Sequence, residues 1–386
     1  MMRSMKIVLV VLLVLSLNGC GSRIELNNLI FVFGLYVDAG KEPGTVEVTI
    51  STPLPNRLNS GQQSGSVTGE SKPYSIVSKS APTITEALSS IQRDLTRRIT
   101  LSHIKVVVIG KAYAQKGIKE LLEWLKREPG FPLGTFVIVS SGPAKEITKL
   151  SPIYEQQPSQ VLMKMASSNS MVKTTIKDCL FAEASNSGYS LTYFFIRKKE
   201  GSIETKNTEY WAGIKGIVIF QGDKMKGTLN IKEAVALAWA SDRVKRSLYS
   251  ATWAGGKGRA SAILKDTKAS SSISITDKGP VFKIRLKGSA SIISIENADD
   301  HNDHEFKMVS DMIKDKLEKS ISKDVSSAIR KTQVVGADVL HLGLLIEWND
   351  PKLWMKLKDQ WEDYYAHKVD IRVSTHVEIS DFGAAR

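Results

Sequence analysis

The first twenty residues constrain this chain more than any other stretch. Arg3 and Lys6 supply a positive start, and residues 7–17 then form an apolar run whose one polar residue is the small Ser16. A membrane-spanning helix needs about 18 or more apolar residues, so this run is too short to span and has the pattern of an export signal. We therefore predict that residues 1–19 are a signal peptide and that the rest of the chain is exported.

The signal ends in Leu17, Asn18, Gly19 and Cys20, a tetrapeptide that resembles a bacterial lipobox. In a lipobox the cysteine sulfur carries a diacylglyceryl thioether and the preceding peptide bond is cut, so Cys20 is the predicted lipidation site. Two or three acyl chains contribute about 0.8 kcal/mol per buried CH₂, which makes such an anchor durable. The alternative is an ordinary signal peptide that has a cysteine at its cleavage site.

The only other cysteine, Cys179, lies in the apolar context IKDCLFAEAS. It is predicted to be a small buried hydrophobic residue. If Cys20 is acylated, Cys179 has no partner within the chain, and no intramolecular disulfide is expected.

Composition indicates a folded exported protein with a basic surface. Hydrophobic residues make up 42% of the chain and charged residues 24%, and its 386 residues exceed one ordinary core, which favours two or three domains. The net charge of +13 suits contact with anionic lipid headgroups. Export and the lack of a zinc-finger or other nucleic-acid motif argue against nucleic acid as a partner.

The N-terminal part alternates predicted strands and helices, which is typical of an α/β domain and is assigned to residues 20–204. Residues 29–37 are predicted to be a buried strand, and residues 45–50 alternate with period two, as a half-exposed strand does. Thr83 and Glu86 form a capping box that opens a helix whose apolar stripe reaches Ile99. Also expected are strands at 104–110 and 135–140, a helix striped from Ile118 to Leu125, a short helix after Pro143 and a polar loop over 55–72.

Beyond residue 205 the pattern changes. A hairpin-like turn at 222–227 and a helix over 231–239 define a small predicted middle domain, residues 205–257. A C-terminal α+β domain, residues 258–386, begins with long strands that can pair antiparallel. Its long helix is amphipathic, and the core-facing stripe consists of Phe306, Val309, Ile313, Leu317, Ile321, Val325 and Ile329.

After this helix, Asp350 and Pro351 supply a cap and a first-turn proline for another helix. Trp354, Leu357, Trp361 and Tyr364 are expected to line it, and residues 368–379 alternate as a strand. The predicted fold class is therefore α+β. We expect several mixed α/β domains with antiparallel sheets, and a C-terminal domain in which the long amphipathic helix packs on a sheet.

Three stretches of the chain carry a shared pattern: residues 103–147, residues 216–234 and a terminal block with Gln333, Asp338, Leu342, Gly343, Asp350, Pro351, Trp354 and Trp361. Together they resemble the Ger(x)C family, the C-subunit lipoproteins of spore germinant receptors, in which the terminal-block residues stand at motif positions. The resemblance covers almost the whole mature chain. Two stretches depart from the family pattern. Residues 21–23 are Gly-Ser-Arg where Trp-Asp is common, and residues 340–343 are LHLG in place of the phenylalanine-containing DVFGFG ending.

The resemblance implies a non-enzymatic, lipid-anchored subunit on the outer face of the spore inner membrane. Its expected partners are membrane lipid, through acylated Cys20, and the integral-membrane A and B subunits of the receptor. Small nutrients trigger such a receptor to start germination, and this subunit is expected to act as a scaffold without a cofactor. Whether it binds a small molecule directly is left open.

The stretch NADDHNDHEF, residues 297–306, is the densest cluster of potential metal ligands. His301 and His304 could share a metal with one of the carboxylates of Asp299, Asp300, Asp303 and Glu305. Acidic residues directly before a long helix more simply cap its free N–H groups, and we predict that role instead of a metal site. The remaining histidines, His103, His341, His367 and His376, are dispersed, and no catalytic triad is visible.

The glycine-rich stretch WAGGKGRA, residues 253–260, lacks P-loop spacing, so we predict a flexible join between domains. Two other function classes are considered. A solute-binding lipoprotein of an importer is expected to have two similar doubly wound lobes, which the differing N-terminal and C-terminal patterns disfavour. An envelope enzyme is expected to place a perturbed acid, base or nucleophile in a cleft, and the sequence identifies none.

Overall fold

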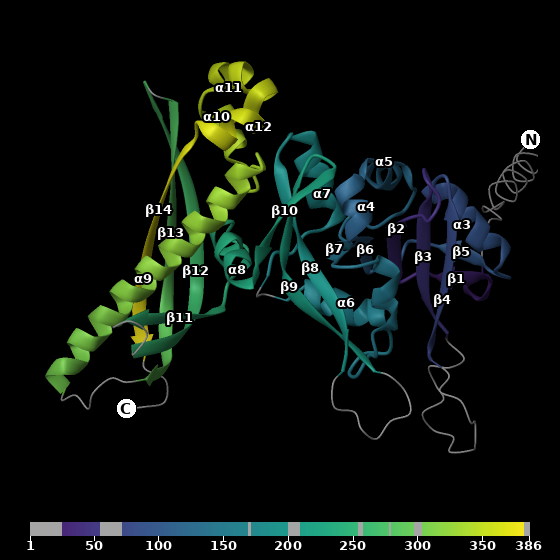
Figure 1. Ribbon diagram of the computed structural model, residues 1–386, viewed down its shortest axis with the longest axis horizontal. Coiled ribbons are helices and arrows are strands. Elements are labelled where there is room, and N and C mark those ends of the chain that lie inside the picture. Colours follow the sequence, from purple (N-terminus) through teal and green to yellow (C-terminus); the bar gives the residue numbers. More distant parts are fainter. Residues whose placement is uncertain are drawn as a thin grey trace, which may run out of the picture.

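A computed structural model of the chain describes residues 25–54, 72–168, 171–199, 209–253, 258–277, 279–296 and 303–381. Within these residues the strands form an eight-stranded, a four-stranded and a two-stranded sheet. Figure 1 shows an elongated molecule in which the two larger sheets follow one another along the long axis, with helix α8 between them. The predicted fold class, several mixed α/β units with antiparallel sheets, is confirmed.

The eight-stranded sheet has the order β10-β9-β8-β7-β6-β2-β3-β4. Its strands are β2 (Gly34–Ala39), β3 (Val46–Pro53), β4 (Tyr74–Ala81), β6 (Val106–Gly110), β7 (Phe136–Ser140), β8 (Gly188–Lys198), β9 (Tyr210–Gln221) and β10 (Lys224–Asn230). The helices around it are α3 (Ile84–Arg93), α4 (Lys111–Lys116), α5 (Lys119–Arg127), the 3-10 helix η3 (Ala144–Lys149), α6 (Pro158–Ala166) and α7 (Ile176–Ala184). The small sheet pairs β1 (Leu29–Phe31), which follows the 3-10 helix η1 (Leu26–Asn28), with β5 (Arg98–Thr100).

The centre of this sheet is parallel and is covered on both faces. β2, β6, β7 and β8 pair in parallel, while hairpins add antiparallel strands at both edges. In β6, Val107 and Ile109 pack with α3, α5 and α7, whereas Val106 and Val108 pack with η3 and α6. The continuous apolar run of this strand follows from burial on both faces, which parallel strands require.

Two N-terminal expectations are wrong in detail. β3 is not half-exposed, because Thr49 and Ser51 on its polar face are also buried. Their hydroxyls can be buried because they are hydrogen-bonded, Thr49 to Ser78 at 2.7 Å and Ser51 to Tyr36 at 3.4 Å.

Helix α3 keeps the predicted cap, in which the Glu86 N–H donates to Thr83 Oγ1 at 3.2 Å, but it ends at Arg93 rather than continuing toward Ile99. The side chain of Gln92 forms hydrogen bonds with the backbone of Arg97 and Ile99. These bonds hold the turn that leads the chain into β5. The stripe residues beyond Arg93 therefore pack against the core from a turn and a strand.

The four-stranded sheet has the order β11-β12-β13-β14 and carries its helices on one face. Its strands are β11 (Ser247–Trp253), β12 (Gly258–Thr276), β13 (Gly279–Glu296) and β14 (Asp370–Asp381), and the helices that pack on it are α8 (Ile231–Ala240), α9 (Asp303–Val334) and α10 (Leu342–Asn349). The long strands β12 and β13 pair antiparallel, as predicted, and β14 joins β13 in parallel.

The predicted core stripe of α9 is confirmed for the residues whose side chains the structure describes. Ile313, Leu317, Ile321, Val325 and Ile329 are buried in one cluster with the inward side chains of β12 and β13. The side chains of Phe306 and Val309, and residues 55–71 of the loop predicted over 55–72, lie outside the described part of the chain. A helix with one apolar face gains most of its stability from such packing, so the sheet and α9 depend on each other.

Hydrogen bonding divides residues 209–253 between two sheets, whereas the predicted middle domain, residues 205–257, treats them as one unit. β9 and β10 belong to the eight-stranded sheet, whereas β11 belongs to the four-stranded sheet. Trp253 at the end of β11 pairs with Gly258 at the start of β12, so the glycine-rich stretch connects two neighbouring strands of one sheet. Strand pairing with distant segments determines which sheet these residues join. A shift in composition along the chain does not reveal that pairing.

We predict that Leu317→Ala destabilises the protein by about 2–5 kcal/mol, because it leaves a cavity between α9 and the four-stranded sheet. Urea unfolding followed by circular dichroism measures this. Lys319→Ala on the exposed side of α9 is the control, since its 2.8 Å ion pair with Asp315 lies on the surface and is worth at most about 1 kcal/mol. Equal losses from the two variants would contradict this account of α9.

Candidate functional site

The predicted lipidation site, Cys20, lies outside the described residues, which begin at Glu25. The first strand, β1, starts nine positions after Cys20, so a lipid on this cysteine would hold the β1 end of the molecule. Among the described helices, none is long and apolar enough to cross a membrane. The candidate anchor therefore remains the lipobox-like sequence that ends in Cys20.

The other cysteine is placed as predicted. Cys179 lies in α7, is 1% exposed, and belongs to the core of the eight-stranded sheet. Burial raises the pKa of its thiol, so this sulfur stays a protonated hydrophobic side chain. Cys179 is therefore a useful internal reference for experiments on Cys20.

The structure does not bring the dispersed histidines together. Each has its own surroundings: His103 contacts Ser102, His341 contacts the ring of Phe181, His367 contacts Asp363, and His376 lies between Glu318 and Glu378. The cluster at 297–302 and the side chains of 303–306 lie outside the described part. Within that part, no group of three or more histidine, cysteine or acidic side chains is arranged to hold a metal.

The residues of the terminal motif, in contrast, converge on one buried carboxyl group. Asp338 is 1% exposed, and its oxygens accept hydrogen bonds from the N–H groups of Leu342 at 2.9 Å and Gly343 at 2.8 Å. The indole Nε1 of Trp361 donates a third bond, at 3.0 Å, to the same carboxyl group. Asp338 thus joins the start of α10 (Leu342–Asn349) to a tryptophan that follows it in the chain by 23 positions.

Gly343 explains why a small residue stands at this motif position. A Cβ atom there would lie 2.8 Å from Trp354 Cη2 and 2.9 Å from Trp361 Nε1, which is closer than side chains pack. The two indole rings meet edge to face, with 5.6 Å between their centroids. The close approach of the α10 backbone to these rings is what allows Trp361 to reach Asp338.

The predicted helix after Asp350 starts as expected but is divided. Asp350 accepts from the Leu353 N–H at 3.0 Å, and the segments are α11 (Pro351–Leu357), the 3-10 helix η5 (Lys358–Gln360) and α12 (Trp361–His367). Tyr365 rather than Tyr364 is fully buried, and its hydroxyl bonds Thr332 at 2.8 Å. Gln333 of α9 donates to the backbone carbonyls of Tyr365 and Val369, which fastens α12 to the long helix.

The electrostatics of this cluster show a structural role. Burial raises the pKa of Asp338, and the N–H groups that donate to it oppose that shift. Burial lowers the pKa of the neighbouring His341. The carboxyl group is therefore held by N–H donors and by the indole, and its donors leave no oxygen facing solvent or a cavity. We assign the motif to building the C-terminal end of the molecule.

A second set of contacts joins the two large sheets, and sequence reasoning missed it. Arg243, after α8, donates to the Lys173 carbonyl at 3.1 Å and lies 3.6 Å from Asp178 of α7. A Cβ on Gly188, at the start of β8, would lie 2.9 Å from the backbone of Ala337, so the two units touch closely there. Arg243 and Asp178 line a cavity of about 270 Å³, together with Phe181 and His341. Residues so far apart in the chain carry no shared sequence signal.

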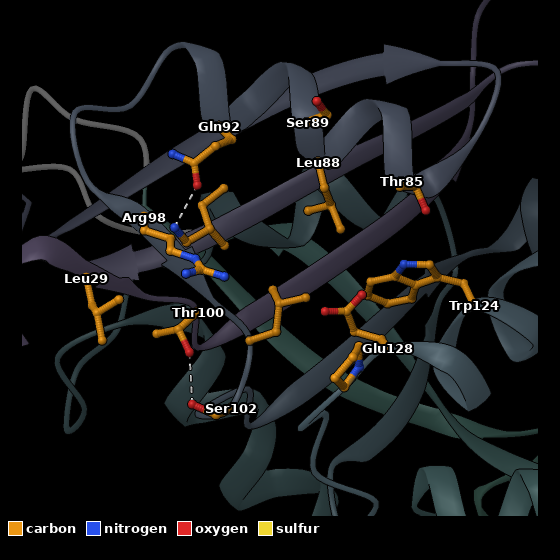
Figure 2. Close-up of a pocket in the computed structure, with 13 residues that line it drawn as sticks. Leu29, Thr85, Leu88, Ser89, Gln92, Arg98, Thr100, Ser102, Trp124 and Glu128 are labelled. Atoms are coloured by element: carbon orange, nitrogen blue, oxygen red, sulfur yellow. Dashed lines mark hydrogen bonds between the residues drawn. The ribbon is translucent and has the colours of Figure 1, made fainter. Parts of the chain in front are cut away.

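Figure 2 shows a groove of about 610 Å³ between α3, β5 and the end of α5. Leu88, Ile99 and Trp124 supply apolar surface, while Gln92 and Glu128 are polar side chains at the groove. Gln92 is used by the backbone of β5, and burial raises the pKa of Glu128. No histidine, cysteine or lysine is among the described lining residues, and the apolar side chains beside the polar ones make the groove a candidate contact surface.

Comparison with protein families decides the assignment. Residues 22–208 match the family model described as "Spore germination protein N-terminal domain", and residues 215–383 match "Spore germination B3/ GerAC like, C-terminal". The chain belongs to this spore germination protein family. The predicted Ger(x)C resemblance is thereby confirmed, and the two matched regions together span nearly all of the chain after Cys20.

Individual relatives agree with this assignment. The Bacillus subtilis (strain 168) protein YfkR is 26% identical over 364 residues, covering 93% of this chain and 92% of YfkR. Spore germination protein KC of the same strain is 25% identical, with 96% and 94% covered. The crystal structure of the GerBC protein superposes with a TM-score of 0.57 at 17% identity, covering 90% of this chain and 97% of that chain, which shows a shared fold.

We predict that Asp338→Asn destabilises the protein by about 1–3 kcal/mol, because an amide NH₂ cannot accept the hydrogen bonds that one carboxyl oxygen accepts. Urea unfolding followed by tryptophan fluorescence reports on the change, since Trp354 and Trp361 lie in the cluster. Glu347→Gln, an exposed change of the same chemistry on α10, is the control and should leave the transition in place. A midpoint for Asp338→Asn equal to that of the control would refute the structural role.

Proposed function

We propose that this protein is the lipid-anchored C subunit of a spore germinant receptor and acts as a non-catalytic scaffold in nutrient-triggered germination. The single observation that carries the proposal is membership of the spore germination family over both matched regions. The lipobox-like sequence ending in Cys20 supports attachment to the membrane. In this proposal the protein lies on the outer face of the spore inner membrane and docks on integral-membrane A and B subunits.

The described structure supports a scaffold in two ways. Its motif residues build a buried cluster in which the start of α10 and Trp361 share the carboxyl group of Asp338. The contacts of Arg243 and Gly188 hold the two large sheets against each other. A rigid elongated body tethered at one end can present fixed surfaces to partners in the same membrane.

The alternative, a solute-binding lipoprotein of an importer, calls for two similar lobes around a ligand cleft. The two large sheets differ in strand number, in order and in the helices that cover them. No observation in the described residues favours the importer, and the receptor subunit remains the proposal.

The anchor is tested by Cys20→Ala. We expect this variant to leave the membrane fraction for the soluble fraction, because the sulfur that would carry the acyl chains is absent. Cys179→Ala is the matched control, since Cys179 is buried in the core, and that variant should stay with the membrane. Retention of Cys20→Ala in washed membranes, or an unmodified Cys20 thiol found by mass spectrometry of the native protein, would overturn the anchor.

The role in the receptor is tested in spores that lack this gene. We expect germination to fail with a subset of nutrients from a panel, and the A and B subunits to be lost from, or less abundant in, the spore membrane. Complementation with the wild-type gene should restore both. Recovery of the tagged protein alone from solubilised membranes, with partner levels and germination unchanged in the mutant, would contradict the scaffold proposal.

A further inference from the structure

The four-stranded sheet has an outer face that no described helix covers. Helices pack on the inner face, where Phe282 of β13 is buried against α10–α12, and Ile284 and Leu286 are buried against α8 and α9. The residues that alternate with them, Lys283, Arg285 and Lys287, point to the opposite face and are exposed. In Figure 1 this sheet stands at the end of the molecule away from β1.

Strand register places positive charge in three adjacent rows across this face. The rows are Ser272, Lys283 and Arg372; Ser270, Arg285 and Ser374; and Lys268, Lys287 and His376. We call the five residues Lys268, Lys283, Arg285, Lys287 and Arg372 the basic sheet face. All five are exposed, and the side chains between them are mostly small serines, which leaves the cations accessible to a flat surface.

Two of these rows set like charges directly opposite each other. Lys268 pairs in register with Lys287, and Lys283 pairs with Arg372. Like charges on directly opposite positions of neighbouring strands destabilise a sheet. Opposite charges at these positions would stabilise the fold, so fold stability alone does not explain this arrangement. An anionic surface bound over the rows would neutralise the repulsion between the like charges.

Nearby carboxylates compensate only the edge of the face. Asp370 bonds Arg372 at 2.8 Å, and Glu378 lies 3.7 Å from His376, both on β14. In the central strands, Arg285 donates to the Ser272 hydroxyl at 3.3 Å, and Lys268, Lys283 and Lys287 have no ion-pair partner within the described residues. The uncompensated charge therefore lies on β12 and β13.

The composition of the face indicates which kind of anionic surface it suits. Protein interfaces are enriched in aromatic residues, methionine and arginine and are depleted in lysine at their centre. The basic sheet face has lysine and serine at its centre and no phenylalanine, tyrosine or tryptophan in its three rows. Lysine and arginine near an anionic bilayer, in contrast, contribute attraction through charge alone.

We propose that the basic sheet face docks on a membrane surface that contains anionic phospholipid headgroups. The inference rests on the proposed function only in requiring that the chain is exported to a membrane. A lipid on Cys20 would hold the β1 end of the molecule, and the basic sheet face is a second contact at the other end. Together the two contacts would restrict how the elongated body turns on the bilayer.

The test uses the mature chain from residue 20, prepared without its lipid, and vesicles of phosphatidylcholine with or without phosphatidylglycerol. We expect sedimentation with the phosphatidylglycerol vesicles only, and binding that weakens as salt is raised. The variant K268S/K283S/K287S should lower the partition coefficient by about 100-fold, given what each lysine contributes near an anionic surface. Its thermal stability should be unchanged or higher, because like-charge pairs are removed.

The matched control is K41S/K116S/K119S, which removes the same charge from exposed lysines of the N-terminal unit. Equal loss of vesicle binding in both triple variants would mean that net charge alone binds, and would overturn the proposal. Equal binding with and without phosphatidylglycerol would do the same. Competition by inorganic phosphate at low concentration would identify a phosphate site in place of a membrane surface.

The remaining outcome separates lipid from protein. If K268S/K283S/K287S binds phosphatidylglycerol vesicles like the wild type but no longer recovers the membrane subunits from solubilised membranes, the face binds an acidic protein surface and the lipid proposal is wrong. Because the vesicle assay contains neither acylated Cys20 nor partner subunits, its result does not depend on the anchor and scaffold tests.

Discussion

The buried carboxyl group of Asp338 is the interaction on which the C-terminal end of the molecule depends. Its oxygens accept hydrogen bonds from the N–H groups at the start of α10 and from the indole of Trp361. Trp361 follows α11 and η5 in the chain. Burial of an acid without such donors costs several kcal/mol, so the fold must supply all of them at once. The family motif positions are therefore the parts of one local structure.

That local structure also determines what the long helix can do. Gln333 and Thr332 of α9 bond the segment around Tyr365, so the end of α9 is fixed while its apolar stripe covers the four-stranded sheet. The turn that follows α9 meets the start of β8 at Gly188. Motion of the C-terminal unit is thereby resisted by packing, which is what a scaffold between a membrane and its partners requires.

The same sheet has two faces with different physical roles. Its inner face is apolar and is buried against α8 and α9, whereas its outer face carries aligned cations that the fold does not neutralise. A period-two alternation in β13 encodes both faces in one stretch of sequence. Alternate residues of this one strand therefore pack in the core or form the charged surface.

Much of the fold could be predicted from local patterns. The spacing of Ile313, Leu317 and Ile321 and the Asp350 cap both depend on neighbours a few positions away, and both were predicted correctly. The burial of the polar face of β3 was not, because hydroxyl partners for Thr49 and Ser51 come from β4 and β2. The end of α3 was also missed, because Gln92 bonds the backbone of Arg97 and Ile99 beyond the turn that ends the helix.

By itself, the sequence determined several of the elements, the core stripe of α9, the family and the position of the candidate anchor at Cys20, because each depends on residues that are close together in the chain. The tertiary structure alone decided how β9, β10 and β11 are shared between sheets, how Arg243 meets Asp178, and that Asp338 meets Trp361. It also placed Lys268 beside Lys287 and Lys283 beside Arg372. Those contacts follow from strand register and helix packing between distant segments, which local spacing does not specify.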